Sequence, residues 1–252
     1  MRSLSTSLLA CLLLFPACSG TEEPTPEPTP KEAPAPEAAP EAAPEAAPEA
    51  APAKVWTLPE GHHPALLDPS QATETAPESF KARFETTKGV FVVQVHRDWA
   101  PNGADRFYNL IKIGFYENAG FFRTIPGFMG QFGISAYPKV SAKWRNAKIE
   151  DDPVKEKNTR GRLTFATAGP NTRTTQLFIN FTDRNVTLDG QGFSPFGEVI
   201  EGMEIVDSLH MTGEGAPKGP GPNQGVLQSR GNAYLESDFP EIDYIKKITL
   251  VE

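Results

Sequence analysis

One stretch in the middle of the chain decides its fold: Phe121-Phe122-Arg123-Thr124-Ile125-Pro126-Gly127-Phe128-Met129-Gly130-Gln131. Residues with β-forming side chains flank a Pro-Gly pair, which is typical of a turn between two strands. The pattern predicts strands over 121–125 and 128–134. Such a hairpin would hold an arginine, an apolar wall and an amide at fixed offsets on two neighbouring strands.

A second block lies further along the chain, Phe165-Ala166-Thr167-Ala168-Gly169-Pro170-Asn171-Thr172, followed by Gln176-Leu177-Phe178-Ile179. Leu188-Asp189-Gly190 and Phe196-Gly197-Glu198-Val199 come after it. No block is specific alone, and Gly169-Pro170-Asn171-Thr172 by itself reads as a turn. In this order and spacing, however, the blocks resemble those of the cyclophilins, the peptidyl-prolyl cis/trans isomerases.

The resemblance implies a mainly β fold, a cyclophilin-like closed eight-stranded antiparallel β-barrel capped by two α-helices. The pattern of many short strands with few helices agrees with a closed barrel but does not distinguish this barrel from others. Further strands are expected over 80–86, 90–95, 163–168, 176–181, 196–200 and 244–251. Helices are expected from Pro101 to about Gly114, where Ala104, Phe107, Tyr108 and Ile111 mark one face, and over 202–210. The segments 135–160 and 211–240 look irregular, as long functional loops often are.

The implied chemistry needs no bond to break. A peptide bond before proline turns slowly because resonance gives it double-bond character. Twisting the bond returns a lone pair to the prolyl nitrogen, so a hydrogen-bond donor that reaches this nitrogen lowers the barrier. An arginine supplies such a donor without titrating. The resemblance therefore implies no cofactor and no bound metal.

By the resemblance, Arg123 is the catalytic arginine, and Gln131 orients it and holds the substrate backbone. The same resemblance assigns substrate contacts to Phe128, Met129, Ala166, Thr167, Gln176, Phe178 and Leu188. Taken singly, the apolar residues of this set are more often barrel core, and a lone arginine is more often a surface ion-pair partner. Their joint order favours the functional interpretation.

The chain departs from the family in the second half of this set. Thr167 stands where Asn is more common, and Thr187 and Gly192 stand where many members have Trp and His. Phe193 is expected to form the pocket wall where that His would be. Because the missing Trp is a main contact of cyclosporin, we expect weak inhibition by this drug.

The first 18 residues have the order of a secretory signal: Arg2, a short apolar run over 8–15, then Ala17-Cys18. The run is too short to span a bilayer. Cys18 is the expected lipidation site of a bacterial lipoprotein. Cys11 is a competing site, and an ordinary secretory signal with an incidental Cys18 is the alternative. Ser19 in place of Asp favours the outer membrane, facing the periplasm, over the inner one.

Residues 19–53 are expected to form a disordered tether. Prolines recur at every fourth position and oppose a helix, in favour of an extended polyproline-like chain; they are Pro36, Pro40, Pro44, Pro48 and Pro52. At ~3.1 Å per residue the tether would reach on the order of 100 Å. Most of the net charge of −8 falls here, since the stretch has eight glutamates and one lysine.

The remaining chain divides into an irregular lead-in segment, 54–79, and an isomerase domain, 80–252. Its near-neutral charge gives no sign of a nucleic-acid surface. The adjacent His62 and His63 lack further ligands and are expected to be plain loop residues. The expected partners are proline-containing polypeptide segments, bound by a monomer that meets the membrane only through its lipid anchor.

Two other functions are compatible with the sequence. The domain could be a non-catalytic module that binds proline peptides, or a structural lipoprotein of the cell envelope that docks a partner. The arginine at position 123 argues against a pure binding module, which has little need of it.

Overall fold

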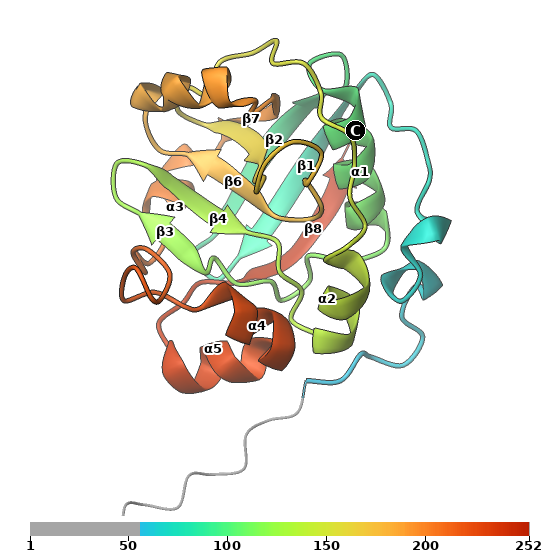
Figure 1. Ribbon diagram of the computed structural model, residues 1–252, viewed down its shortest axis with the longest axis vertical. Helices are drawn as coiled ribbons and strands as arrows, with labels where there is room; N and C mark the ends of the chain where they lie inside the picture. Colours follow the sequence, from blue (N-terminus) through green and yellow to red (C-terminus); the bar gives the residue numbers. More distant parts are fainter. Residues whose placement is uncertain (1–55, 252) are drawn as a thin grey trace, which may run out of the picture. The chain divides into compact units, whose positions relative to one another are not determined.

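The strands of the computed structural model, which describes residues 56–251, form one antiparallel sheet in the order β3-β4-β6-β5-β7-β2-β1-β8 (Figure 1). The strands are β1 (Ser79–Thr86), β2 (Val90–His96), β3 (Arg123–Ile125), β4 (Met129–Phe132), β5 (Arg162–Phe165), β6 (Leu177–Asn180), β7 (Pro195–Glu201) and β8 (Ile245–Val251). Every strand expected from the sequence is present, with ends that differ by a few residues. The predicted signal, 1–18, and tether, 19–53, lie outside the described residues.

The expectation of a fully closed barrel is wrong in one respect. The edge strands β3 and β8 do not pair with each other, so the eight-stranded sheet stays open between them. The gap is bridged just before both strands, where Gly120 and Tyr244 form an isolated antiparallel bridge. The Phe121 N–H donates to Asp243 O and the Ile245 N–H to Ala119 O, both at 2.9 Å. Strand β3 has only three residues, too few to continue this pairing.

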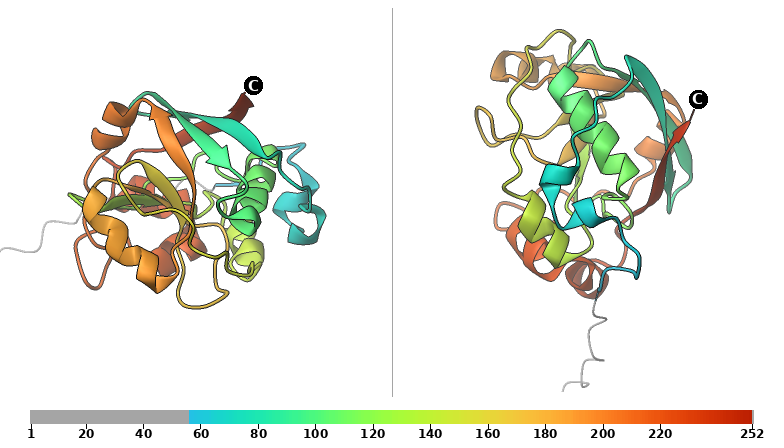
Figure 2. Two further views of the ribbon diagram at one scale, coloured as in Figure 1. Left: turned by 90° about the horizontal axis from the view of Figure 1, so that it is seen from above. Right: turned by 90° about the vertical axis from the view of Figure 1, so that its right-hand side faces the viewer.

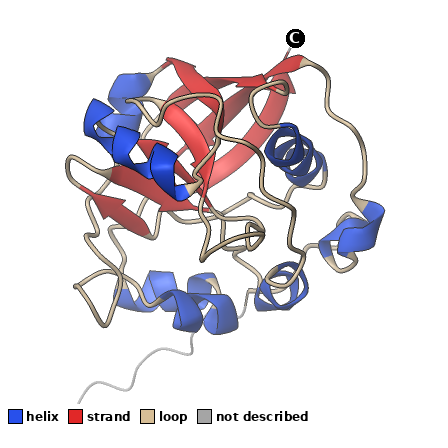
Figure 3. Cartoon of the chain, turned by 45° about the horizontal axis from the view of Figure 1, so that its top comes forward, coloured by secondary structure: helices blue, strands red, loops and turns tan. Residues whose placement is uncertain are grey.

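Five α-helices lie within residues 56–251, where the sequence predicted two. They are α1 (Pro101–Lys112), α2 (Pro138–Trp144), α3 (Met203–Asp207), α4 (Gln224–Arg230) and α5 (Asn232–Asp238). Helices α1 and α3 match the predicted pair, whereas α2, α4 and α5 fall in segments expected to be irregular. Figure 3 shows the helices on the outside of the strands. None of the helices in this part of the chain is both long and apolar enough to cross a bilayer.

Helix α1 covers the aromatic core. Pro101 opens it at a position where the missing N–H costs no hydrogen bond. Phe107 is fully buried, as the predicted helical face requires, and lies 5.3 Å from the ring of Phe196 and 6.2 Å from that of Phe84. Phe84 in turn stacks on Phe91 of β2 at 4.4 Å. Interlocked rings of this kind hold the sheet and α1 in one register.

The lead-in segment belongs to the folded body. It has two short 3-10 turns, η1 (Pro64–Leu66) and η2 (Pro69–Gln71) (Figure 2). The first turn packs on α2, and the chain after the second runs along the outer face of α1. The indole N–H of Trp144 in α2 donates to Ala65 O and Leu66 O, both at 3.2 Å. The Asn109 side chain of α1 pairs with both backbone groups of Glu74. The sequence left the role of this segment undecided because its prolines hide the few apolar residues that anchor it.

Candidate active site

The β3–β4 hairpin sets the first two site residues face to face. Its turn needs glycine at position 127, where the backbone has φ +66°, a region that other residues rarely adopt. Arg123 and Gln131 are direct partners across the two strands. Cross-strand partners point to the same side of a sheet, and here Nη1 of Arg123 donates to Oε1 of Gln131 at 3.0 Å. The predicted pairing of arginine and amide is therefore a consequence of strand register.

The amide of Gln131 is itself held from its other end. Its Nε2 donates to Oε1 of Gln176 at 2.9 Å. Gln131 is buried, so both of its polar atoms need these partners. The resulting chain Arg123–Gln131–Gln176 runs from β3 across β4 to the residue before β6.

These residues line a cavity of about 380 Å³. The structure brings every residue predicted for catalysis or substrate binding to its wall: Arg123, Phe128, Met129, Gln131, Ala166, Thr167, Gln176, Phe178, Leu188 and Phe193. The predicted lipidation site, Cys18, lies outside the described residues. The guanidinium carbon of Arg123 lies 5.8 Å from the centre of the Phe128 ring. A charged donor beside an apolar wall suits a ligand with an apolar ring and a polar backbone.

Phe193 completes the apolar wall. Its ring meets that of Phe178 edge to face at 5.8 Å, in the geometry that aromatic pairs prefer. Phe193 follows the 3-10 helix η3 (Asp183–Gln191), which also carries Leu188 into the cavity. Thr187, on the same helix, is exposed and is not part of the wall.

The opposite side of the cavity is the loop between β5 and β6. Ala166 N–H donates to Gln176 O at 2.9 Å and closes the base of this loop. Inside it, the hydroxyls of Thr167 and Thr172 contact each other at 2.9 Å, and Ala168 N–H donates to the Thr172 hydroxyl, also at 2.9 Å. Three further loop residues, Ala168, Thr172 and Thr174, line the cavity although the sequence did not single them out.

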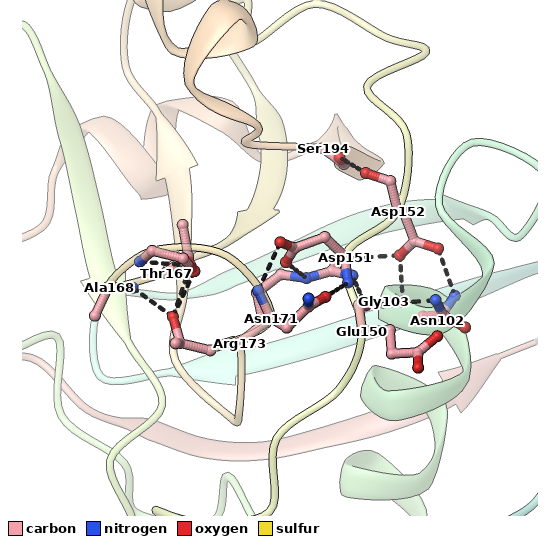
Figure 4. Close-up of polar contacts among 12 residues, drawn as sticks. Asn102, Gly103, Glu150, Asp151, Asp152, Thr167, Ala168, Asn171, Arg173 and Ser194 are labelled. Atoms are coloured by element: carbon pink, nitrogen blue, oxygen red, sulfur yellow. Dashed lines mark hydrogen bonds and ion pairs between the residues drawn. The ribbon is translucent and has the colours of Figure 1, made fainter.

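A buried ion pair ties this loop to helix α1 (Figure 4). Nη1 of Arg173 lies 3.0 Å from a carboxylate oxygen of Asp152, and both side chains are almost fully buried. The same carboxylate accepts the N–H groups of Asn102 and Gly103, each at 2.9 Å, at the start of α1. Because Ala100 offers no side-chain cap, Asp152 caps the helix from a distant part of the chain.

Glu214 is the main residue that the sequence did not single out. Its carboxylate accepts two hydrogen bonds from Arg123, from Nε at 2.6 Å and from Nη2 at 2.7 Å. These bonds hold the pKa of Glu214 below its usual value. The glycine- and proline-rich composition marked 211–240 as a functional loop, but nothing in a separation of 91 residues pairs this glutamate with Arg123. Gln224, at the start of α4, also lines the cavity from this region.

Residues 56–251 contain no group of three or more His, Cys, Asp or Glu side chains arranged to hold a metal. The side chains of the cavity offer hydrogen-bond donors, amide groups and apolar surface, with no nucleophile and base in contact. The arrangement can bind a polypeptide and polarise one of its amides.

Comparison with known proteins shows the family of the chain. Residues 81–228 match the family described as cyclophilin type peptidyl-prolyl cis-trans isomerase/CLD. The chain is 35% identical over 178 residues to peptidyl-prolyl cis-trans isomerase B of Escherichia coli, which covers 67% of this chain and 98% of that protein. It is 34% identical over 133 residues to an isomerase of Acinetobacter baylyi, over 50% of this chain and 69% of the relative. The chain belongs to the cyclophilin family and is a peptidyl-prolyl cis-trans isomerase.

A solved structure agrees at the level of the fold. The cyclophilin type isomerase of Cryptosporidium parvum superposes with a TM-score of 0.52 at 24% identity, over 69% of this chain and 98% of the other. A second structure of that protein was obtained in the presence of the dipeptide Ala-Pro, with a TM-score of 0.51. The mainly β architecture expected from the sequence is therefore shared with a cyclophilin of known structure.

Proposed function

We propose that this cyclophilin accelerates isomerisation of X-Pro bonds by stabilising the twisted prolyl amide with Arg123. The observation that carries the proposal is the place of the guanidinium. It lies at the cavity wall between the Gln131 amide, at 3.0 Å, and the Phe128 ring, at 5.8 Å. A proline ring against the apolar wall would bring its nitrogen to the arginine.

The chemistry follows from the amide itself. In the planar amide the nitrogen lone pair is delocalised and accepts hydrogen bonds poorly. As the bond twists, the lone pair returns to the nitrogen and becomes an acceptor. A donor at this place therefore binds the transition state more tightly than either ground state, which is the condition for catalysis.

The polar groups around the wall have a second task in this mechanism. Rotation about one bond requires that the chain on one side of the proline stays fixed. Gln131 and Gln176 offer amide groups, and Ala166 and Thr167 offer backbone groups, along the groove beside the cavity. We assign these four residues to holding the substrate backbone, and Phe128, Met129, Phe178, Leu188 and Phe193 to the proline ring.

The test measures cis/trans exchange of an Ala-Pro-Phe peptide by NMR with the purified protein and its Arg123→Ala variant. We expect the variant to lose about 10²–10³-fold in kcat/KM, the usual effect of removing one transition-state donor, and to keep peptide binding. Undiminished exchange in the variant would refute the role of Arg123. Binding without accelerated exchange in the parent would instead favour the module that only binds proline peptides.

The substrates that we propose are proline-containing segments of exported proteins as they fold. The support is the order of charged, apolar and small residues in the first 18 positions, with Cys18 as the lipidated residue of an envelope lipoprotein on the outer membrane. Labelling of cells with a fatty-acid analogue, followed by membrane fractionation, tests the lipid anchor at Cys18 and its place on the outer membrane. Label that persists in Cys18→Ala, or that appears in inner membranes alone, would contradict the proposed anchor.

A further inference from the structure

Glu214 binds Arg123 in the one geometry that fixes a guanidinium plane. Its two carboxylate oxygens accept from Nε at 2.6 Å and from Nη2 at 2.7 Å, as a parallel pair of charge-assisted bonds. Gln131 takes one N–H of the remaining nitrogen, Nη1. These three hydrogen bonds, with a longer contact of 3.9 Å from Nη1 to the sulfur of Met129, hold the guanidinium before any substrate arrives.

The fold brings Glu214 to this place by covering the open edge of the sheet. Strand β3 is an edge strand, and its Thr124 bonds with the segment that follows α3. Thr124 N–H donates to the Thr212 hydroxyl at 2.9 Å, Thr212 N–H to the Thr124 hydroxyl at 2.7 Å, and Gly213 N–H to Thr124 O at 2.8 Å. Glu214 follows Gly213 and so lies beside Arg123, the neighbour of Thr124 in β3.

The loop that carries Glu214 holds it independently of Arg123. Gly221 N–H donates to the Glu214 carbonyl at 2.8 Å, and Gly215 N–H donates to its carboxylate at 3.0 Å. The backbone at Gly219 also packs closely against Glu214. A Cβ added at Gly219 would lie only 2.5 Å from Glu214 O and 2.8 Å from Glu214 Cβ. The carboxylate is therefore a fixed support, against which the longer and more flexible arginine side chain is aligned.

We propose that Glu214 is a positioning residue of the isomerisation, which sets the guanidinium of Arg123 so that the second N–H of Nη2 meets the prolyl nitrogen. Nη1 is already engaged by Gln131 and, at 3.9 Å, by the sulfur of Met129. This inference rests on the proposed role of Arg123. Small errors in the placement of a catalytic group are costly, since a shift of about 1 Å can lower a rate about 100-fold. Glu214 touches no substrate in this scheme, so its loss affects the turnover and leaves the wall that binds proline intact.

The test compares Glu214→Gln, Glu214→Ala and Glu214→Asp with Arg123→Ala in the peptide exchange assay. We expect Glu214→Gln, which keeps one acceptor but loses the charge, to lower kcat about tenfold with KM changed less than about twofold. Glu214→Ala should lose more. Glu214→Asp keeps the charge on a shorter side chain, so it should recover part of the loss.

The control is a second arginine–carboxylate pair away from the cavity. Asp207 binds Nη2 of Arg160 at 2.5 Å with both side chains near 40% exposed, and Asp207→Asn should leave kcat and KM unchanged. If Arg123→Ala is inactive while Glu214→Gln and Glu214→Ala both keep full kcat, the positioning role is overturned and the proposed function stands. If Arg123→Ala keeps its activity, the proposed function fails and the positioning role fails with it.

A spectroscopic measurement on the unsubstituted protein does not depend on whether the variants fold. A guanidinium held by two carboxylate bonds should show a slowly exchanging Arg123 Nε–H signal and restricted rotation in 15N NMR. Fast exchange and free rotation of this group would overturn the inference.

Discussion

At the scale of single residues, the link between Arg123 and Glu214 makes a prediction about pH. The hydrogen bond from Arg123 is the largest effect on the pKa of Glu214, and it lowers the pKa more than partial burial raises it. The Gly215 N–H and the charge of Lys218 act in the same direction as Arg123. A carboxyl group with a depressed pKa in the folded state stays ionised until the pH falls below its ordinary value.

The sign of the effect follows from that depression. The interaction is complete above the unfolded-state pKa, about 4.3 for glutamate, and is lost as the pH falls through the lower folded-state pKa. We expect kcat/KM for a neutral peptide to stay level from pH 8 to about pH 5 and to fall only below the ordinary glutamate range. The acid limb should be absent in Glu214→Gln. A midpoint near pH 6 in the parent would contradict this prediction.

The apolar wall makes a second prediction at this scale. Phe193 and Phe178 form the wall by edge-to-face contact, while Thr187, where many cyclophilins have Trp, is exposed outside it. By its resemblance to other cyclophilins, the chain is expected to lack a main contact for cyclosporin. We expect weak inhibition in the peptide exchange assay, and submicromolar inhibition would refute the prediction.

At the scale of elements, Asp152 connects helix α1 with the loop that forms one side of the groove. It caps the helix through Asn102 and Gly103 and neutralises Arg173, whose side chain is only 2% exposed. Asp151 also lies 3.2 Å from Nε of Arg173, but it does not replace the bond of Asp152 to Nη1 or its cap on the helix. We expect Asp152→Asn to lower the free energy of unfolding by about 3 kcal/mol in urea titration.

The exposed pair of Arg160 and Asp207, which is the control for catalysis, is also the control for this stability measurement. Asp207→Asn removes a surface bond to Arg160, and such pairs contribute at most about 1 kcal/mol. Equal losses in Asp152→Asn and Asp207→Asn would mean that the buried pair contributes no more than a surface one.

The helices also show which elements can be predicted from sequence periodicity and which cannot. Helix α1 was predicted because its apolar face repeats over three turns and opens with Pro101. Helices α2, α4 and α5 have seven residues each, which is too short for such a repeat to stand out. Prolines and glycines around them, as in 216–222, favoured an irregular interpretation. These helices are held by contacts with one another and with the lead-in segment, which periodicity does not express.

At the scale of the whole molecule, the lead-in segment is expected to contribute to stability. Leu66 is 6% exposed, and its carbonyl accepts the indole N–H of Trp144. We expect Leu66→Ala to lower the free energy of unfolding by about 2–4 kcal/mol, the usual cost of such a buried truncation. The measurement is urea denaturation followed by tryptophan fluorescence.

Leu67 provides the matched comparison, because it is the next residue and is only partly buried against the core. Leu67→Ala should cost clearly less than Leu66→Ala. If neither variant changes the unfolding midpoint, the segment is an appendage without a structural role.

The sequence by itself determined the family, the mainly β class, the hairpin and most of the residues that line the cavity, but not Ala168, Thr172, Thr174 or Gln224. These follow from local order: alternation along strands, a Pro-Gly turn, and blocks whose spacing places Arg123 opposite Gln131. Only the tertiary structure decided that the sheet stays open between β3 and β8, that Asp152 caps α1, and that Glu214 orients Arg123. The physical reason is that these three features depend on contacts between residues tens of positions apart. An edge strand, a helix without a side-chain cap and a charged side chain each need a partner. The path of the whole chain decides which distant segment provides it.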